Sequence, residues 1–436
     1  MMVRTLEQTA MRKVYLRLLP FVVLMYFLCY LDRINVGFAA LTMNKDLGLT
    51  ASAFGLAAGM FFWGYCLFEV PSNIVLEKVG ARLWIARIMI TWGLLSGATA
   101  FCTGPYSFLT VRFLLGVAEA GFFPGIVLFL TYWFPDRHRA RIMAGFTLAI
   151  PGAVALGAPI STALLGLNGV WGLAGWRWMF IAEAVPTVLI GIIVLFYLTD
   201  RPQQARWLDD EQRAWLTGTI DSERERIEAH RKIGLFRALW EPKVLLLALN
   251  YFGIVTASLG MLLFLPQIIK QLGLTTMQIG WATAVPYLCG CLSMTLWGWI
   301  SDRMGERRWN LFGACLLSAG GLIVAGMTVG TYWSLVGMSM AAAGFYGTKG
   351  MFWSMPSMFL TGMAAATGIA WINSLGNLGG FFGPSIVGFV KDQTGSFAGG
   401  LYALAAFATM SAVVSAFWLN IPRHVEVERP VRVAAE

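Results

Sequence analysis

Long apolar runs alternate with short polar stretches along the whole sequence. A helix of about 20 apolar residues is long enough to cross the hydrocarbon core of a bilayer. By this criterion the chain contains twelve predicted spans. They cover residues 18–41, 53–77, 83–102, 106–131, 141–165, 177–199, 242–269, 277–300, 309–329, 332–360, 364–389 and 398–421. The pattern predicts an all-α polytopic membrane protein.

The stretch 200–241 divides these spans into two sets of six. It is rich in acidic and basic residues, and we expect it to be a solvated linker with one amphipathic helix. That helix would carry Trp207, Leu208, Trp215 and Leu216 on its apolar side. The predicted organisation is therefore a six-helix bundle over 1–199, a linker over 200–241, and a second bundle with a tail over 242–436.

A repeated motif supports this division. The loop after the second span has the sequence Asn73–Arg82, and the loop after the eighth has Gly298–Arg307. In both, an acid is followed by a base, then by a glycine two residues later and an arginine two residues after that. The glycine permits a tight turn, and the bases can meet helix carbonyls or the neighbouring acid. Such parallel repeats are typical of a transporter with its site between two bundles, near the midplane.

Composition and charge agree with the membrane assignment. The chain is 58% hydrophobic and 13% charged, whereas soluble domains have about 25% charged residues. Of the 32 Lys and Arg residues, 25 fall on the side that carries both chain ends, and 4 on the other. This bias predicts that both termini are cytoplasmic, and it explains the net charge of +9 without a nucleic-acid partner.

Metal or cofactor chemistry has little support in the sequence. The six cysteines lie in or at the ends of apolar spans without zinc or redox spacing, and the three histidines lie in predicted loops or the tail. No nucleotide-binding loop is present. We expect no disulfide, no metal, no cofactor and no enzymatic activity.

Four charged residues lie inside the spans of the first half. Asp32 and Arg33 are adjacent in span one, while Arg112 and Glu119 share one face of span four about 10.5 Å apart along its axis. Charges at this depth are costly and usually mark pathways for ions or substrates. Arg112 and Glu119 are too far apart to pair with each other, so crossed pairs with Asp32 and Arg33 are expected. A purely structural cluster is the alternative, and it suits Asp32 and Arg112 best.

These segments resemble the anion:cation symporter branch of the major facilitator superfamily. The resemblance covers nearly the whole chain, although Asn73 replaces the first glycine of the loop signature. The motifs that carry it are Tyr30–Asn35, Trp63–Asn73, Arg112–Gly125, Tyr132–Pro135, Gly175–Phe180 and Asn373–Pro384. The resemblance implies two six-helix bundles and proton-coupled transport of an organic anion. It further implies proton roles for Asp32 and Glu119 and a substrate role for Arg33.

Further candidates for substrate binding come from both halves. Besides Arg112, they are Tyr65, Trp353, Asn373, Asn377 and Lys349. Packing or helix–helix hydrogen bonding is the alternative for the first four of these, and snorkelling to an interface for Lys349. Lys349, Trp353 and Pro356 are expected on one helical face.

Two other buried acids are expected to be structural. Glu69 would brace the cytoplasmic end of span two, and Glu183, near Arg177, would stabilise span six.

The expected function is proton-coupled uptake of a small organic acid, such as a hydroxy acid, a sugar acid or a dicarboxylate. The expected partners are that acid, protons and the bilayer, and the expected location is a bacterial inner membrane, with the protein as a monomer. The alternative is a membrane sensor that has kept the fold without transport.

Overall fold

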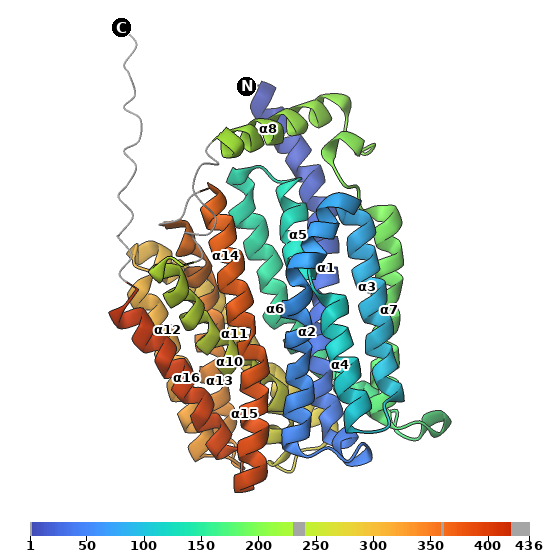
Figure 1. The fold of residues 1–436 in the computed structure, drawn as a ribbon, viewed down its shortest axis with the longest axis vertical. Helices are drawn as coiled ribbons and strands as arrows, with labels where there is room; N and C mark the ends of the chain where they lie inside the picture. Colours follow the sequence, from blue (N-terminus) through green and yellow to red (C-terminus); the bar gives the residue numbers. More distant parts are fainter. Residues whose placement is uncertain (1, 230–239, 359–361, 420–436) are drawn as a thin grey trace.

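The computed structural model describes residues 2–229, 240–358 and 362–419, and its regular elements there are all helical. Most of the helices run side by side along the long axis of the molecule (Figure 1). The α-helices are α1 (Met2–Asp46), α2 (Ala51–Val79), α3 (Ala81–Ala98), α4 (Pro105–Glu119), α5 (Phe122–Thr131), α6 (Asp136–Leu165), α7 (Gly175–Tyr197), α8 (Asp210–Ala229), α10 (Pro242–Lys270), α11 (Thr276–Met304), α12 (Arg308–Met327), α13 (Trp333–Ser354), α14 (Gly362–Asn377), α15 (Gly379–Thr394) and α16 (Ala398–Phe417).

The helices correspond to the predicted spans. Within the described residues, ten helical segments are long and apolar enough to cross a membrane. The other two predicted spans correspond to α13 and to α14 and α15 in tandem.

The predicted elements differ from the structure in three places. The fourth span is interrupted, because Gly121 has a left-handed φ of 85° that cannot continue a helix after Glu119. In the linker, Trp207 and Leu208 precede α8 instead of lying on it, although Leu208 and Leu216 are both buried. Finally, α13 ends at Ser354, so Pro356 lies in a separate 3-10 turn.

Helices of the first half pack mainly on one another, as do those of the second half. In the first half α3 packs on α7, α2 on α4 and α1 on α6; in the second, α12 packs on α13 and α16, and α11 on α13. Figure 1 shows the blue-to-green helices on one side of the molecule and the yellow-to-red helices on the other. The halves meet where α1 packs on α10, α2 on α15 and α6 on α11. The exact boundaries of the two units stay a prediction.

The end of the molecule opposite α8, called the distal end below, is closed by polar contacts between the halves (Figure 1). Asp392 of α15 accepts hydrogen bonds from the backbone N–H groups of Ala51 and Ser52, at 3.1 and 2.7 Å. The first N–H groups of a helix have no partner within the helix, so the Asp392 carboxylate caps α2 from the other half. Lys270 donates to the carbonyl of Leu41 at 2.8 Å.

The two motif loops turn through their glycines. Gly80 and Gly305 have φ values of 99° and 61°, which side chains with a Cβ rarely adopt. In the second loop Arg307 pairs with the motif acid Asp302 at 3.2 Å. In the first, Arg82 instead pairs with Asp200, which follows α7. The motif arginine therefore pairs within its own loop in the second half and with the residue after α7 in the first.

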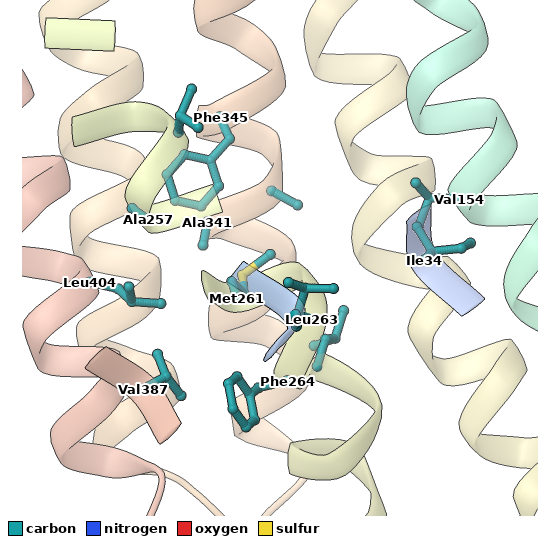
Figure 2. Packing of buried hydrophobic residues seen from close by; sticks show 14 of the residues in the cluster. Ile34, Val154, Ala257, Met261, Leu263, Phe264, Ala341, Phe345, Val387 and Leu404 are labelled. Atoms are coloured by element: carbon teal, nitrogen blue, oxygen red, sulfur yellow. The ribbon is translucent and has the colours of Figure 1, made fainter. Parts of the chain in front are cut away.

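Buried apolar side chains form a core that extends across the contact between the halves. In Figure 2, Met261, Leu263 and Phe264 of α10 lie between Ile34 of α1 and the side chains of the second half. The backbone of α1 comes close to α10 because Gly37 has no side chain. A Cβ at that position would lie 2.9 Å from the carbonyl oxygen of Leu263.

Replacing Gly116 should destabilise the first bundle. A Cβ at Gly116 would lie 2.0 Å from the carbonyl oxygen of Phe61, and a backbone atom cannot rotate away. We expect Gly116→Ala to push α4 away from α2 and to lower the stability of the fold by about 1–3 kcal/mol. The melting temperature in detergent should fall accordingly. Gly320→Ala is the control, since nothing lies within 4 Å of its Cβ position. Equal melting temperatures of both variants and the wild type would contradict this packing argument.

Candidate functional site

A buried ion pair joins α1 to α4. Nε of Arg33 donates to Oε1 of Glu119 at 2.7 Å, and a second guanidinium nitrogen contacts the same oxygen. The Glu119 side chain is 1% exposed and that of Arg33 18%. The thiol of Cys29 also donates to this oxygen, at 3.2 Å. Removing either charge would leave the other uncompensated, which is strongly unfavourable in a buried site.

Asp32 is held by neutral donors instead of a cation. Trp92 and Thr187 donate to one carboxylate oxygen at 2.7 and 3.1 Å, while Ser96 and Asn35 donate to the other at 2.8 and 3.4 Å. The expected pair between Asp32 and Arg112 is not formed among the described residues, because α3 and α7 supply enough donors. Of the crossed pairs predicted between spans one and four, only that of Arg33 with Glu119 is present.

Arg112 is a buried cation that forms no ion pair within the described residues. Its side chain is 3% exposed, its Nε has no hydrogen-bond partner, and no described carboxylate pairs with it. The guanidinium carbon lies 5.2 Å from the centre of the Phe61 ring. A buried guanidinium with unused donors can bind an incoming carboxylate through charge-assisted hydrogen bonds.

Aromatic rings surround Arg33. Its guanidinium carbon lies 5.4 Å from the ring centres of Tyr30, Phe61 and Tyr65. The predicted site residue Tyr65 is thus beside the cation, and Phe61 is near both arginines. Rings at this distance attract a cation and exclude water from it.

The second half supplies a lysine to the same region. Nζ of Lys349 lies 5.3 Å from the ring centre of Tyr251 on α10, and the Trp353 ring lies 5.0 Å from that of Tyr251. Lys349 and Trp353, one helical turn apart, therefore share the face of α13 toward α10, whereas Pro356 does not continue that face. No acid within the described residues pairs with Lys349. Tyr251 and Tyr30 both pack in the apolar core that joins α1 to α10.

Sequence reasoning missed three tyrosines of the second half. They are Tyr251, Tyr287 and Tyr346, and isolated tyrosines in apolar spans were the only signal for them. The buried hydroxyl of Tyr287 has no hydrogen-bond partner among the described residues, and its ring lies 6.0 Å from that of Tyr346. Tyr346 belongs to the second half, but it also packs against a cluster of buried apolar side chains that all come from residues 11–216. Tyr346 therefore lies where the two halves meet.

The two asparagines of α14 have different surroundings. The amide of Asn373 donates to Glu69 of α2 at 2.9 Å, and Ser374 donates to the second carboxylate oxygen at 3.3 Å. The Glu69 carboxylate, which the sequence predicts to brace the cytoplasmic end of span two, links this part of α2 to α14 of the other half. Asn377 is half-buried at the last position of α14, and its side chain bonds to none of the described residues.

The Glu183 side chain forms no ion pair with Arg177, although the two residues are close in sequence. It accepts a hydrogen bond from Ser161 at 2.7 Å, while Arg177 donates to the backbone carbonyls of Ala100 and Cys102. The two residues are therefore parts of separate contacts, and Glu183 fastens α7 to α6.

A groove of about 480 Å³ lies elsewhere, on α11. It is lined by Cys289, Leu292, Ser293, Leu296, Trp297, Ile300 and Asn310. None of these side chains is charged, so this groove does not suit an organic anion.

Comparison with known proteins shows similarity over nearly the whole chain. The family model for the Major Facilitator Superfamily matches residues 22–384 and 264–434. A "Putative tartrate transporter" of Agrobacterium vitis is 51% identical over 94% of each chain. The "Inner membrane transport protein RhmT" of Escherichia coli K12 is 38% identical, over 96% of this chain and 97% of its own. A "Quinolone resistance transporter" of Acinetobacter baumannii is 41% identical over 92% of each.

Solved structures show the same architecture at low sequence identity. An inward-facing bacterial homologue of the human lysosomal transporter Spinster superposes with a TM-score of 0.75 at 16% identity, over 92% of this chain and 96% of its own. The xylose transporter XylE of Escherichia coli gives 0.73 at 12% identity, over 93% and 99%. The all-helical polytopic fold predicted from the sequence is confirmed.

Proposed function

Because the chain belongs to the Major Facilitator Superfamily and is a membrane transporter, not an enzyme, we propose that it couples uptake of a small organic anion to protons. The Arg33–Glu119 pair beside the unpaired Arg112 carries this proposal. An incoming carboxylate is drawn to Arg112 and competes with Glu119 for Arg33. Once Glu119 loses its cation in a buried site, it is pushed towards taking up a proton. Binding of anion and proton are thereby linked.

Asp32 is the second proposed proton site. Its four neutral donors come from α1, α3 and α7, so any rearrangement of these helices changes its hydrogen bonding. A carboxylate that depends on neutral donors binds protons differently when donors leave. Asp32 can therefore respond to the transport cycle without contacting the substrate.

A hydroxy dicarboxylate fits the proposed site best. The relatives named for tartrate support this class. Arg33 and Arg112 from the first half, and Lys349 from the second, can each attract a carboxylate. The free Tyr287 hydroxyl and the Asn377 amide can bond to substrate hydroxyls. Trp353 and Tyr65 supply the apolar walls. We place Asn373 outside this set, because its amide is engaged by Glu69.

The proposed mechanism is alternating access. The halves meet through α1/α10, α2/α15 and α6/α11, and rocking them about the site would expose it to either side. The distribution of Lys and Arg supports an orientation with both termini and α8 in the cytoplasm and the distal end outside. The RhmT relative supports an inner-membrane location.

Uptake by proteoliposomes tests this function. Purified protein is reconstituted, and accumulation of radiolabelled tartrate is followed with and without an inward proton gradient. We expect accumulation only with the gradient, and inhibition by other hydroxy dicarboxylates. Specific binding of tartrate without any transport would favour the sensor instead. If neither binding nor transport occurred for tartrate, sugar acids or aromatic acids, the organic-anion proposal would be rejected.

Lys349 should distinguish dicarboxylates from monocarboxylates. Replacing it by methionine keeps the length of the side chain and removes the charge. We expect Lys349→Met to weaken binding of a dicarboxylate about tenfold or more, as loss of one charged hydrogen bond implies, and to spare a monocarboxylate. Isothermal titration with both acids measures this. Lys45→Met, at an exposed position of α1, is the control. Equal losses for both acids would refute the selectivity.

A further inference from the structure

Glu69 is a buried carboxylate that joins the two halves of the protein. It belongs to α2 and is 5% exposed. Both its oxygens accept hydrogen bonds from α14, one from the Asn373 amide at 2.9 Å and one from the Ser374 hydroxyl at 3.3 Å. One turn earlier, the thiol of Cys66 contacts the carbonyl of Ser374 at 3.6 Å. All these partners come from the opposite half of the chain.

No cation compensates this charge. Within the described part of the chain Glu69 makes no ion pair, and Arg33 attracts it only at longer range. Neither α5 nor α14 carries a titratable side chain among the described residues. Titratable and charged groups on α2 and on the other elements around it include Tyr30, Asp32 and Arg33 on α1, Tyr65, Cys66, Glu77 and Lys78 on α2 itself, Arg82 and Arg87 on α3, Arg112 and Glu119 on α4, Tyr251 on α10, and Lys391 and Asp392 at the distal end of α15.

The bridge lies at one end of the contact between α2 and the second half. From the distal end inward, the backbones of α2 and α15 are in direct contact. A Cβ on Gly388 would lie 2.2 Å from the carbonyl of Ala51, and a Cβ on Gly55 would lie 2.3 Å from that of Pro384. Glu69 is about 27 Å along α2 from Ala51. A motion that opens the distal end and separates α2 from the second half along this whole contact would also move Asn373 and Ser374 away from Glu69.

We propose that Glu69 is an additional proton-binding residue of the transport cycle, which binds its proton when Asn373 and Ser374 move away. The proposal rests on the alternating access proposed above. A desolvated carboxylate is stable while neutral donors hold it, and a buried carboxylate without donors favours the protonated form. Since the donors belong to α14 and the acid to α2, relative motion of the halves changes the proton affinity.

The direction of the effect follows from linkage. The closed distal end coexists with a fully bonded Glu69, so this conformation favours the ionised acid. Binding of a proton must then favour the conformation that has lost the bonds, by the same factor. Lowering the pH should therefore shift the protein towards an open distal end. Glu69→Gln should produce much of this shift at any pH, because glutamine carries no charge for α14 to stabilise.

A distance measurement without substrate tests the proposal. Tyr106 and Tyr332 are exposed at the distal end, in different halves. p-Acetylphenylalanine at both positions carries spin labels without changing the native cysteines, and pulsed electron resonance gives their distance in liposomes at pH 5 to 8. We expect the open fraction of the otherwise unchanged protein to rise as the pH falls. In Glu69→Gln, the ratio of open to closed at pH 8 should be about tenfold higher, as loss of one charged hydrogen bond implies.

Matched variants separate this role from general damage. Glu77→Gln makes the same change at an exposed position of α2 and should behave like the unchanged protein. Asn373→Leu removes a donor from the other half. It should also raise the open fraction, and it keeps the test decisive if Glu69→Gln does not fold. Superimposable distances for Glu69→Gln and the unchanged protein at every pH would overturn the proposal. Because no substrate is used, this result is independent of whether the organic-anion assignment is correct.

Discussion

Glu119→Gln should abolish uphill accumulation of the organic acid while preserving its exchange across the membrane. Glutamine has the shape of the protonated acid, so Arg33 is left free to bind the substrate carboxylate. The side chain can no longer take up or release a proton. The proton gradient therefore cannot drive the binding or release of the substrate through this residue. We expect accumulation in proteoliposomes to fall to the equilibrium level, with counterflow of labelled acid close to wild type.

The control for this variant is a second buried acid. Glu183 is 2% exposed and bonds to Ser161, but it has no contact with Arg33. Glu183→Gln should retain accumulation. If the Glu119→Gln variant concentrated the acid as the wild type does, Glu119 would have no part in proton coupling. If both accumulation and counterflow were lost, the side chain would instead be needed for binding.

Arg33→Lys should weaken substrate binding strongly although the charge is kept. The guanidinium presents several donors in a fixed plane, and two of its nitrogens already contact the Glu119 carboxylate. Lysine offers one nitrogen on a flexible chain and cannot make that pair of contacts. Losing one charged hydrogen bond costs about 1.5–3 kcal/mol, so the dissociation constant should rise roughly 10- to 100-fold. Titration calorimetry with the transported acid measures it.

A half-buried arginine elsewhere provides the comparison. Arg87 of α3 stacks on Trp84, with the guanidinium carbon 3.8 Å from the ring centre, and it lies outside the proposed site. Arg87→Lys should leave affinity unchanged. An unaltered dissociation constant for Arg33→Lys would mean that the carboxylate docks elsewhere, with the buried Arg112 as the next candidate.

The sequence by itself determined the architecture, because a bilayer restricts what an apolar chain can do. Backbone groups in hydrocarbon must be satisfied within the helix, so each apolar run of sufficient length becomes a span. The positions of Gly80 and Gly305 also followed from the sequence, since a tight turn after a span needs a residue that tolerates positive φ. Charges inside spans are costly enough that Asp32, Arg33, Arg112 and Glu119 could be singled out directly.

Only the tertiary structure decided which of these charges pair. Arg33 pairs with Glu119, whereas Asp32 accepts hydrogen bonds from Trp92, Ser96 and Thr187. Arg112 pairs with no carboxylate in the described part of the chain. Helical periodicity gives the face of each residue, yet it does not give the rotation and depth at which neighbouring helices meet. The same limit applies to Glu69, whose partners lie some three hundred residues further along the chain. Partners so distant are set by how the halves pack, which local sequence does not encode.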